Sequence, residues 1–227
     1  MFAGPKDRRL LIIGDSAFAE VAYECFRHDS RYDVVGFAVE RAYLARTELF
    51  GLPVFPLEEV EQHVSPGDTW FYAALVYTQL NRLRQRLYEV AKSKGYQPAS
   101  YISSRAFVWP NVTCGEHCFI FEDNTIQPFV SIGSNVVLWS GNHIGHHSRI
   151  DDHVFIASHA VVSGFCRIGS HSFVGVNATI SNNVDIAPDN WIGLGATIAR
   201  NTAAGALYKG PRSEASERSA LDQFGVR

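Results

Sequence analysis

Hydrophobic residues recur with a period of six along this chain from residue 102 onward. Every sixth position from Ile126 to Ile198 is Ile, Leu or Val, and no insertion breaks the register. A fixed six-residue period is typical of a hexapeptide parallel β-helix, whose aliphatic positions point into the core. We therefore predict such a helix over residues 102–206, with three hexapeptides per triangular coil and residues 18 apart stacked. The register continues backwards through Ile120, Cys114, Val108 and Ile102.

A second position of the repeat, the fourth residue after each aliphatic one, is usually small, and we also expect it to point inward. The segment CGEHC, residues 114–118, looks like a metal-binding motif, but this register offers a simpler interpretation. Cys114 falls on an aliphatic position, and Cys118 and Cys166 fall on small ones. We predict buried structural thiols rather than metal ligands. The small positions include Ser148, Ala160, Cys166, Ser172, Ala178 and Ala196.

Residues 1–101 follow a different pattern, in which short apolar runs alternate with stretches of helical spacing. This alternation is typical of a small parallel α/β domain. The predicted helices span residues 17–29 and 78–95, and Phe18, Val21, Ala22 and Cys25 are expected on one face of the first. The predicted strands span residues 10–14, 32–40, 70–76 and, closing the sheet, 99–102.

Composition and charge exclude several classes of protein. The net charge is −3 and no block of like charge occurs, so the basic surface of a nucleic-acid-binding protein is missing. No stretch approaches the roughly 20 apolar residues of a membrane span. The first residues, MFAGPKDRRLLIIG, lack the apolar run of a signal peptide. With only four cysteines, a disulfide scaffold is not expected, and we predict a cytoplasmic protein.

Five of the nine histidines lie three residues after an aliphatic position of the repeat: His117, His147, His153, His159 and His171. Elsewhere this position holds residues that tolerate a left-handed backbone, and Pro128 and Pro188 precede it twice, as in a type II turn. We therefore predict that these histidines occupy coil corners for backbone reasons. The equivalent positions hold Asn135, Gly141, Asn177, Asn183, Asp189, Gly195 and Asn201.

His146 departs from this rule, because it takes the first turn position, where a side chain projects outward. Gly164 lies one coil above it and leaves space beside the imidazole. Such a histidine can serve as a general base, although an ordinary exposed histidine fits the spacing too. A zinc site needs converging ligands, which His143, His146 and His147 could supply only with help from another subunit.

The strand–turn–helix LLIIGDSAFAE and the repeat segments SGNHIGHHSRI, FIASHAVVSGF, VGVNATI and NWIGLGATI resemble the left-handed β-helix sugar acyltransferases. These include bacterial N-acetyltransferases of nucleotide-linked 4-amino-4,6-dideoxy sugars and sialic-acid O-acetyltransferases. The resemblance implies a Rossmann-like domain for the nucleotide-sugar at residues 1–101. It implies a left-handed β-helix at 102–206, a C-terminal tail at 207–227, and a homotrimer that binds acetyl-CoA between neighbouring β-helices.

The resemblance also assigns candidate site residues. The catalytic histidine of the family aligns with His146, and His147 stands where an acidic residue usually follows it. Backbone N–H groups near Gly164 would steady the oxyanion. The expected contacts to acetyl-CoA are Phe155, Val176, Leu194 and, at its phosphates, Lys209 and Arg212. The expected contacts to the nucleotide-sugar are Gly14, Asp15, Ser16, Ala17, Val39, Glu40 and Leu75, the last at a position where glycine is common.

The expected reaction is direct attack of a sugar amino group on acetyl-CoA, in bacterial surface-glycan biosynthesis, with no metal. An acyl-enzyme route is disfavoured because the cysteines are predicted to be buried. Three alternatives stay open at this point. They are a sugar O-acetyltransferase, a metal enzyme resembling γ-class carbonic anhydrases, and a protein that binds a nucleotide-sugar without turnover.

Overall fold

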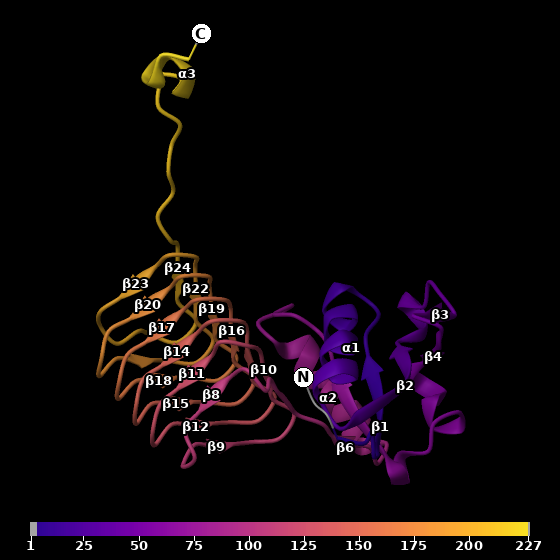
Figure 1. The fold of residues 1–227 in the computed structure, drawn as a ribbon. Helices are drawn as coiled ribbons and strands as arrows, with labels where there is room; N and C mark the ends of the chain where they lie inside the picture. The colour runs from indigo at the N-terminus through magenta and orange to yellow at the C-terminus, as the bar shows by residue number, and fades with distance from the viewer. Residues whose placement is uncertain (1–3, 227) are drawn as a thin grey trace.

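The computed structural model describes residues 4–226, which form an α/β part, a triangular β-helix and an extended C-terminal segment (Figure 1). The α/β part lies beside the β-helix rather than at its end, and the C-terminal segment leads away from the last coil. This segment ends in the short exposed helix α3 (Ala220–Phe224), whose N-cap Ser219 accepts a hydrogen bond from the Asp222 N–H.

The α/β part contains a six-stranded sheet with the order β3-β4-β2-β1-β5-β6, in which only β3 runs antiparallel to its neighbour. Alternate residues of β1 pack on opposite faces, so the sheet is buried on both sides, as parallel sheets are. The strands are β1 (Arg8–Ile13), β2 (Tyr32–Val39), β3 (Glu48–Leu49), β4 (Leu52–Pro56), β5 (Thr69–Ala73) and β6 (Gln97–Pro98). The helices are α1 (Ala17–Asp29), α2 (Arg82–Ser93) and the 3-10 turns at Arg41–Tyr43, Leu57–Gln62 and Pro66–Asp68.

Several predictions for the α/β part need correction. Val21 is 37% exposed, because Tyr23 and Phe26 complete the buried face of α1 instead. Helix α2 begins at Arg82 and not at residue 78, since residues 79–81 all adopt positive φ. The segment 99–102 does not close the sheet. Its last two residues form the first β-helix strand, and β6 closes the sheet instead. Strands β3 and β4 were not predicted.

The β-helix consists of two-residue strands spaced six residues apart, which form three parallel sheets. Residues 18 apart are paired, as Ile120 is with Leu138, except that the last pairing joins Trp191 to Leu207. The parallel sheets and the hexapeptide period fit a left-handed β-helix. The N-facing sheet, which faces the α/β part, contains β7 (Tyr101–Ile102), β10 (Phe119–Ile120), β13 (Val137–Leu138), β16 (Phe155–Ile156), β19 (Phe173–Val174), β22 (Trp191–Ile192) and β24 (Leu207–Tyr208).

The two other sheets carry the remaining strands of each coil (Figure 1). The second sheet contains β8 (Phe107–Val108), β11 (Thr125–Ile126), β14 (His143–Ile144), β17 (Val161–Val162), β20 (Thr179–Ile180) and β23 (Thr197–Ile198). The third sheet contains β9 (Thr113–Cys114), β12 (Ser131–Ile132), β15 (Arg149–Ile150), β18 (Arg167–Ile168) and β21 (Asp185–Ile186).

The interior of the β-helix confirms the predicted core. Every aliphatic position from Ile126 to Ile198 is at most 4% exposed, and the small positions, including Cys166, are buried with them. Cys118 is buried as predicted, but the prediction for Cys114 is wrong, because this thiol is exposed. Cys114 lies in β9, the edge strand of its sheet, so no further coil covers it. Ile102, in the same first coil, is 42% exposed for the same reason.

An aromatic interface joins the α/β part to the N-facing sheet. Phe18 of α1 lies 5.5 Å from Phe119 and 5.2 Å from Trp139, measured between ring centroids. Phe26 packs edge-on against Phe119 at 5.6 Å. These aromatic side chains all belong to one hydrophobic cluster. Because this interface is apolar and buried, it fixes the α/β part against one of the three sheets of the β-helix.

A column of polar corner residues completes this interface. The fully buried His117 accepts a hydrogen bond at Nε2 from the Ala73 N–H (2.8 Å) and donates from Nδ1 to Asn135 Oδ1 (2.9 Å). The Asn135 amide donates to His153 Nδ1 at 3.0 Å. His171 contacts Gln85 of α2 at 2.7 Å. All four column residues have positive φ, as predicted, but their side chains also bind the α/β part, which the sequence did not indicate.

We expect the stability of the protein to fall as the pH drops below 6.5, because of this column. Burial lowers the pKa of His117 to about 3 and that of His153 to about 4, from a usual value of 6.5. At pH values between these lowered pKa values and 6.5, the two histidines bind protons in the unfolded chain but stay neutral in the folded protein. The free energy of unfolding should therefore decrease by about 1.4 kcal/mol per pH unit from His117 alone.

Urea unfolding at a series of pH values between 7 and 5 measures this slope. His117→Gln should flatten it, whereas His28→Gln, which removes an exposed imidazole of α1, should not. Equal slopes in the wild type and in His117→Gln would contradict the assignment.

Candidate functional site

His146 projects from the corner between β14 and β15, in the second and third sheets, and its side chain is exposed. Its N–H donates to Gln127 Oε1 (2.9 Å), and its carbonyl accepts from the Phe165 N–H (2.9 Å), so both neighbouring coils hold the backbone. A Cβ at Gly164 would come within 2.9 Å of both Cε1 and Nε2 of this imidazole. The glycine therefore leaves room for the Cε1 and Nε2 side of the ring to lie against the adjacent coil.

His147 contacts His146 directly, and their Nδ1 atoms are 3.1 Å apart. The His147 ring lies between two exposed aromatic rings, those of Phe129 and Phe165, at 4.5 Å and 4.8 Å. No carboxylate lies within ion-pair distance of either imidazole in the described part of the chain. An orienting partner is therefore present, but it is a second histidine. Neither phenylalanine was singled out from the sequence.

An apolar groove with a basic end runs along the other corner of the second sheet. Val176 and Leu194, 42% and 66% exposed, follow β19 and β22 and form one wall. Lys209 and Arg212 line its far end, and the cavity measures about 320 Å³. The structure thus brings these four residues together. Phe155 does not line this groove and is buried.

Phe155 instead lines an adjoining apolar cavity of about 310 Å³, which also includes Val176 and Ser158. Tyr77, from the loop before α2, covers this cavity and packs against Phe155 and Phe173 at 5.3 Å and 4.4 Å. The sequence contained no signal for this contact, because Tyr77 and Phe155 are far apart along the chain. Val176 belongs to both cavities and connects them.

A third cavity, of about 430 Å³, lies in the α/β part at the carboxyl ends of β1 and β2. Two ion pairs border it: Glu40 with Arg86 (2.7 Å) and Asp15 with Arg46 (3.4 Å). Ala17, the first residue of α1, is outside the lining. Of the residues predicted to contact a nucleotide-sugar, the cavity brings together Gly14, Asp15, Ser16, Val39, Glu40 and Leu75.

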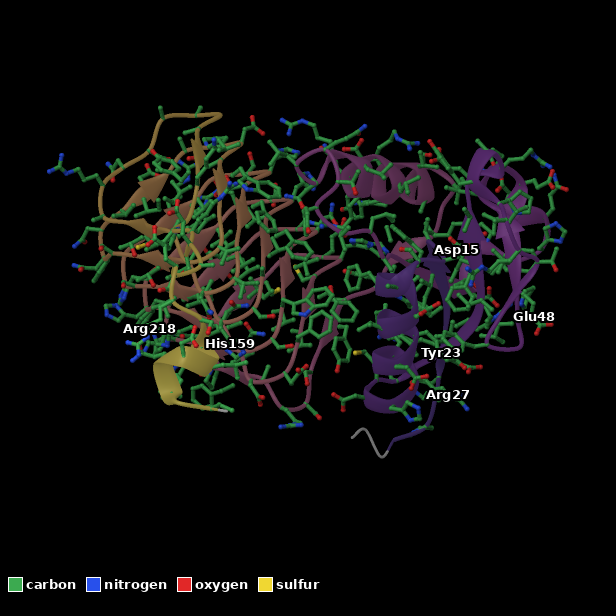
Figure 2. The ribbon with its side chains drawn as sticks, turned by 90° about the horizontal axis from the view of Figure 1, so that it is seen from above. Asp15, Tyr23, Arg27, Glu48, His159 and Arg218 are labelled. Atoms are coloured by element: carbon green, nitrogen blue, oxygen red, sulfur yellow. The ribbon has the colours of Figure 1, made fainter. Side chains whose placement is uncertain are left out.

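His146 lies apart from the groove and from the α/β cavity of its own chain. Figure 2 shows Asp15 within the α/β part, on the opposite side of the molecule from His159 of the β-helix. His146 lies at the corner between the second and third sheets, whereas the α/β part packs on the N-facing sheet. The groove of Val176 and Leu194 lies at yet another corner. In a triangular prism, a corner points away from the opposite face, so the imidazole faces neither cavity of its own chain.

Among residues 4–226, no group of three or more His, Cys, Asp or Glu side chains is arranged to hold a metal ion. No helix within the described residues is long and apolar enough to cross a membrane. His143, which the sequence offered as a possible ligand, lies half-buried in β14.

Residues 129–164 match the family described as bacterial transferase hexapeptide (six repeats). No curated protein sequence matches the chain significantly. Solved structures do match it over most of its length. The acetyltransferase domain of PglB from Neisseria gonorrhoeae superposes with a TM-score of 0.79 at 22% identity, covering 88% of this chain and 95% of that domain.

A variant of perosamine N-acetyltransferase from Caulobacter crescentus, in complex with CoA and GDP-perosamine, gives a TM-score of 0.77 at 24% identity. The match covers 91% of this chain and 93% of that protein. WeeI from Acinetobacter baumannii matches with a TM-score of 0.55 at 19% identity, over 84% and 94% of the two chains. The protein therefore shares its fold with these structures over most of its length.

Proposed function

We propose that this protein is an acetyl-CoA-dependent N-acetyltransferase that modifies the amino group of a nucleotide-linked amino-deoxy sugar. The observation that carries the proposal is the shared fold over about nine-tenths of the chain with an enzyme that holds CoA and GDP-perosamine. Most of the residues expected to bind the two substrates also line cavities. A cytoplasmic role in bacterial surface-glycan biosynthesis follows, because nucleotide-linked sugars are the substrates of that synthesis.

The donor site is the groove at Val176 and Leu194. Its apolar wall suits the pantetheine arm of acetyl-CoA, and Lys209 and Arg212 provide positive charge for the phosphates. The chain of cavities continues past Val176 to Phe155 and Ser158. This places the acyl end of the donor in the direction of the α/β part.

The acceptor site is the cavity at the carboxyl ends of β1 and β2, in what we take to be a Rossmann-like domain. Ser16 is the N-cap of α1, and the first N–H groups of a helix bind phosphate favourably. Gly14 has a φ of 113°, and a Cβ there would lie 3.2 Å from the Ala74 carbonyl oxygen, so the tight turn requires glycine. Arg86, held by Glu40, adds positive charge at the rim.

The separation of His146 from the cavities of its own chain supports a homotrimer with sites between subunits. His146 points away from the α/β part of its own chain, so it reaches an acceptor only when a second copy contributes that acceptor. A three-fold arrangement of β-helices repeats this contact at every interface and closes the assembly.

In the mechanism we infer, the sugar amine attacks the thioester carbonyl carbon while His146 accepts its proton at Nε2. The backbone N–H at Gly164, beside the imidazole, steadies the oxyanion. The C–S bond then breaks, the amide is complete, and the leaving thiolate takes up a proton. Cys118 and Cys166 are buried, which leaves them unsuited to an acyl-enzyme route, and the exposed Cys114 lies in the first coil, two coils away from the corner of His146.

We expect Leu194→Glu to weaken CoA binding at least about tenfold, which corresponds to about 1.4 kcal/mol. The new carboxylate would sit in the apolar wall and would repel the CoA phosphates. Calorimetric titration with CoA measures the change. Leu221→Glu is the matched control, because Leu221 is similarly exposed but lies in α3, outside the groove. Equal affinity in the two variants would place the donor elsewhere.

A further inference from the structure

Three stacked rings, Phe129, His147 and Phe165, form a column on the corner beside His146. Their positions are 18 residues apart, and the ring centroids are separated by 4.5 Å and 4.8 Å. Both phenylalanines are more than half exposed, at 59% and 54%. Phe165 also meets the His146 ring edge-on at 5.0 Å. The column therefore touches both histidines while contributing little to the core.

The backbone at this column is strained, which argues against a random surface position. Phe129 and Phe165 have φ of 64° and 58°, whereas most other corners with positive φ hold Asn, Asp, His or Gly. A left-handed conformation is unfavourable for a bulky side chain, and such strain costs about 1–3 kcal/mol. Within one chain the rings recover little of this cost through burial, and both stack on the histidine between them.

The 3.1 Å contact between the two Nδ1 atoms determines what His146 can do. When both rings are neutral, a single proton lies between these atoms. If His147 carries it, His146 holds its own proton at Nε2 and cannot act as a base there. If His146 carries it, its Nε2 has a free lone pair and the imidazole is ready to accept a proton.

We propose that Phe129 and Phe165 clamp His147 as a neutral acceptor for the Nδ1–H of His146, which keeps His146 in the tautomer that is basic at Nε2. This proposal rests on the proposed function, in which His146 is the general base. His147 and the two phenylalanines are positioning residues, since they act through His146.

The clamp also explains how His147 can take the place of an acidic residue beside His146. As His146 takes up a proton, positive charge spreads towards His147 through the shared hydrogen bond. The faces of Phe129 and Phe165 present the negative side of their quadrupoles to this ring. Two further groups beside His146 are uncharged: the side chain of Gln127 accepts the His146 N–H, and Gly164 lies beneath the ring.

Nitrogen NMR of the full-length protein, labelled with ¹⁵N-histidine and measured at pH 8 without substrate, tests the clamp. We expect His146 to carry its proton at Nδ1 in the wild type, although free histidine favours the Nε2–H form. His147→Phe should fold, because Phe already occupies this corner one coil below and one coil above. In that variant we expect His146 to change to the Nε2–H form and kcat/KM to fall at least about tenfold.

A double variant, Phe129→Asn with Phe165→Asn, separates positioning from folding. Asparagine tolerates positive φ, so thermal stability should be maintained or rise. The fraction of His146 in the Nδ1–H form and kcat/KM should both decrease. Phe107→Asn, which removes an exposed ring on β8, should change neither. An Nε2–H tautomer of His146 in the wild type, or an unchanged tautomer in His147→Phe, would overturn the clamp.

The tautomer is read without turnover, so the two proposals fail separately. An Nδ1–H tautomer in a protein that acetylates no acceptor would keep the clamp and reject the proposed activity. Normal acetyl transfer with His146 in the Nε2–H form would reject the clamp alone.

Discussion

Replacing His146 with alanine is expected to lower kcat/KM for acetyl transfer by about 10²–10⁴, the usual contribution of a general base. The imidazole is exposed, and the hydrogen bonds that tie residue 146 to the neighbouring coils are made by its backbone, with Gln127 and Phe165. Thermal unfolding and oligomeric state should therefore stay as in the wild type. Thiol release from acetyl-CoA, measured over a range of acceptor concentrations, gives kcat/KM directly.

His28→Ala serves as the control for this variant, because it removes an exposed imidazole from α1, far from the β-helix corner. It should retain full activity. If His146→Ala turned over at a near-normal rate, His146 would have no role as the base, whatever the acceptor.

The largest expected effect on stability comes from Arg84, whose guanidinium is fully buried between α2 and the β-helix. It donates to the side chain of Asn135 (3.0 Å), to the side chain of Asn81 (3.2 Å) and to three backbone carbonyls. Burial lowers its pKa to about 10, yet these acceptors keep it charged near neutral pH. Arg84→Met fills similar space but leaves the acceptors without a donor, so we expect a loss of about 3 kcal/mol in the free energy of unfolding.

Urea unfolding measures this loss, and Arg82→Met is the matched control. Arg82 also bridges the two parts, through Asp189, but its side chain is about half exposed, so its removal should cost less than about 1 kcal/mol. Equal losses in the two variants would show that the buried hydrogen bonds of Arg84 stabilise the interface no more than the half-exposed ion pair of Arg82 does.

The β-helix was predictable from the sequence because the same local burial requirement recurs in every hexapeptide. Each hexapeptide must place one aliphatic side chain inside, so the register alone identified the buried positions from Ile126 to Ile198. The left-handed corners followed for a similar reason, since few residue types tolerate positive φ. Asn201 is the exception, because its backbone is not left-handed although it occupies a corner position.

The contacts between the two parts were not predictable, because they join residues that are distant in sequence and carry no periodic signal. The histidine column shows this well. His117 was correctly placed at a corner, but its bond to Ala73 depends on where the α/β part docks. Cys114 was placed inside from the register, yet a register says nothing of where the stack of coils ends.

The candidate site shows the same limit. Repeat analysis identified His146 and the adjacent Gly164, since both properties follow from position in the coil. The partner of His146 could not be inferred, because the stacking of Phe129 and Phe165 on His147 depends on ring orientations that only coordinates provide.

The central claim is tested most directly by measuring thiol release from acetyl-CoA with a panel of nucleotide-linked amino sugars, using acetyl-CoA alone as the blank. The panel should contain 4-amino-4,6-dideoxy sugars linked to GDP, UDP and TDP, and the product should be identified by mass spectrometry. We predict that one member gives rapid thiol release with an equal amount of N-acetylated sugar. Saturable acetyl-CoA binding without release for any member, or an acetyl group on oxygen, would contradict the proposed N-acetyltransferase.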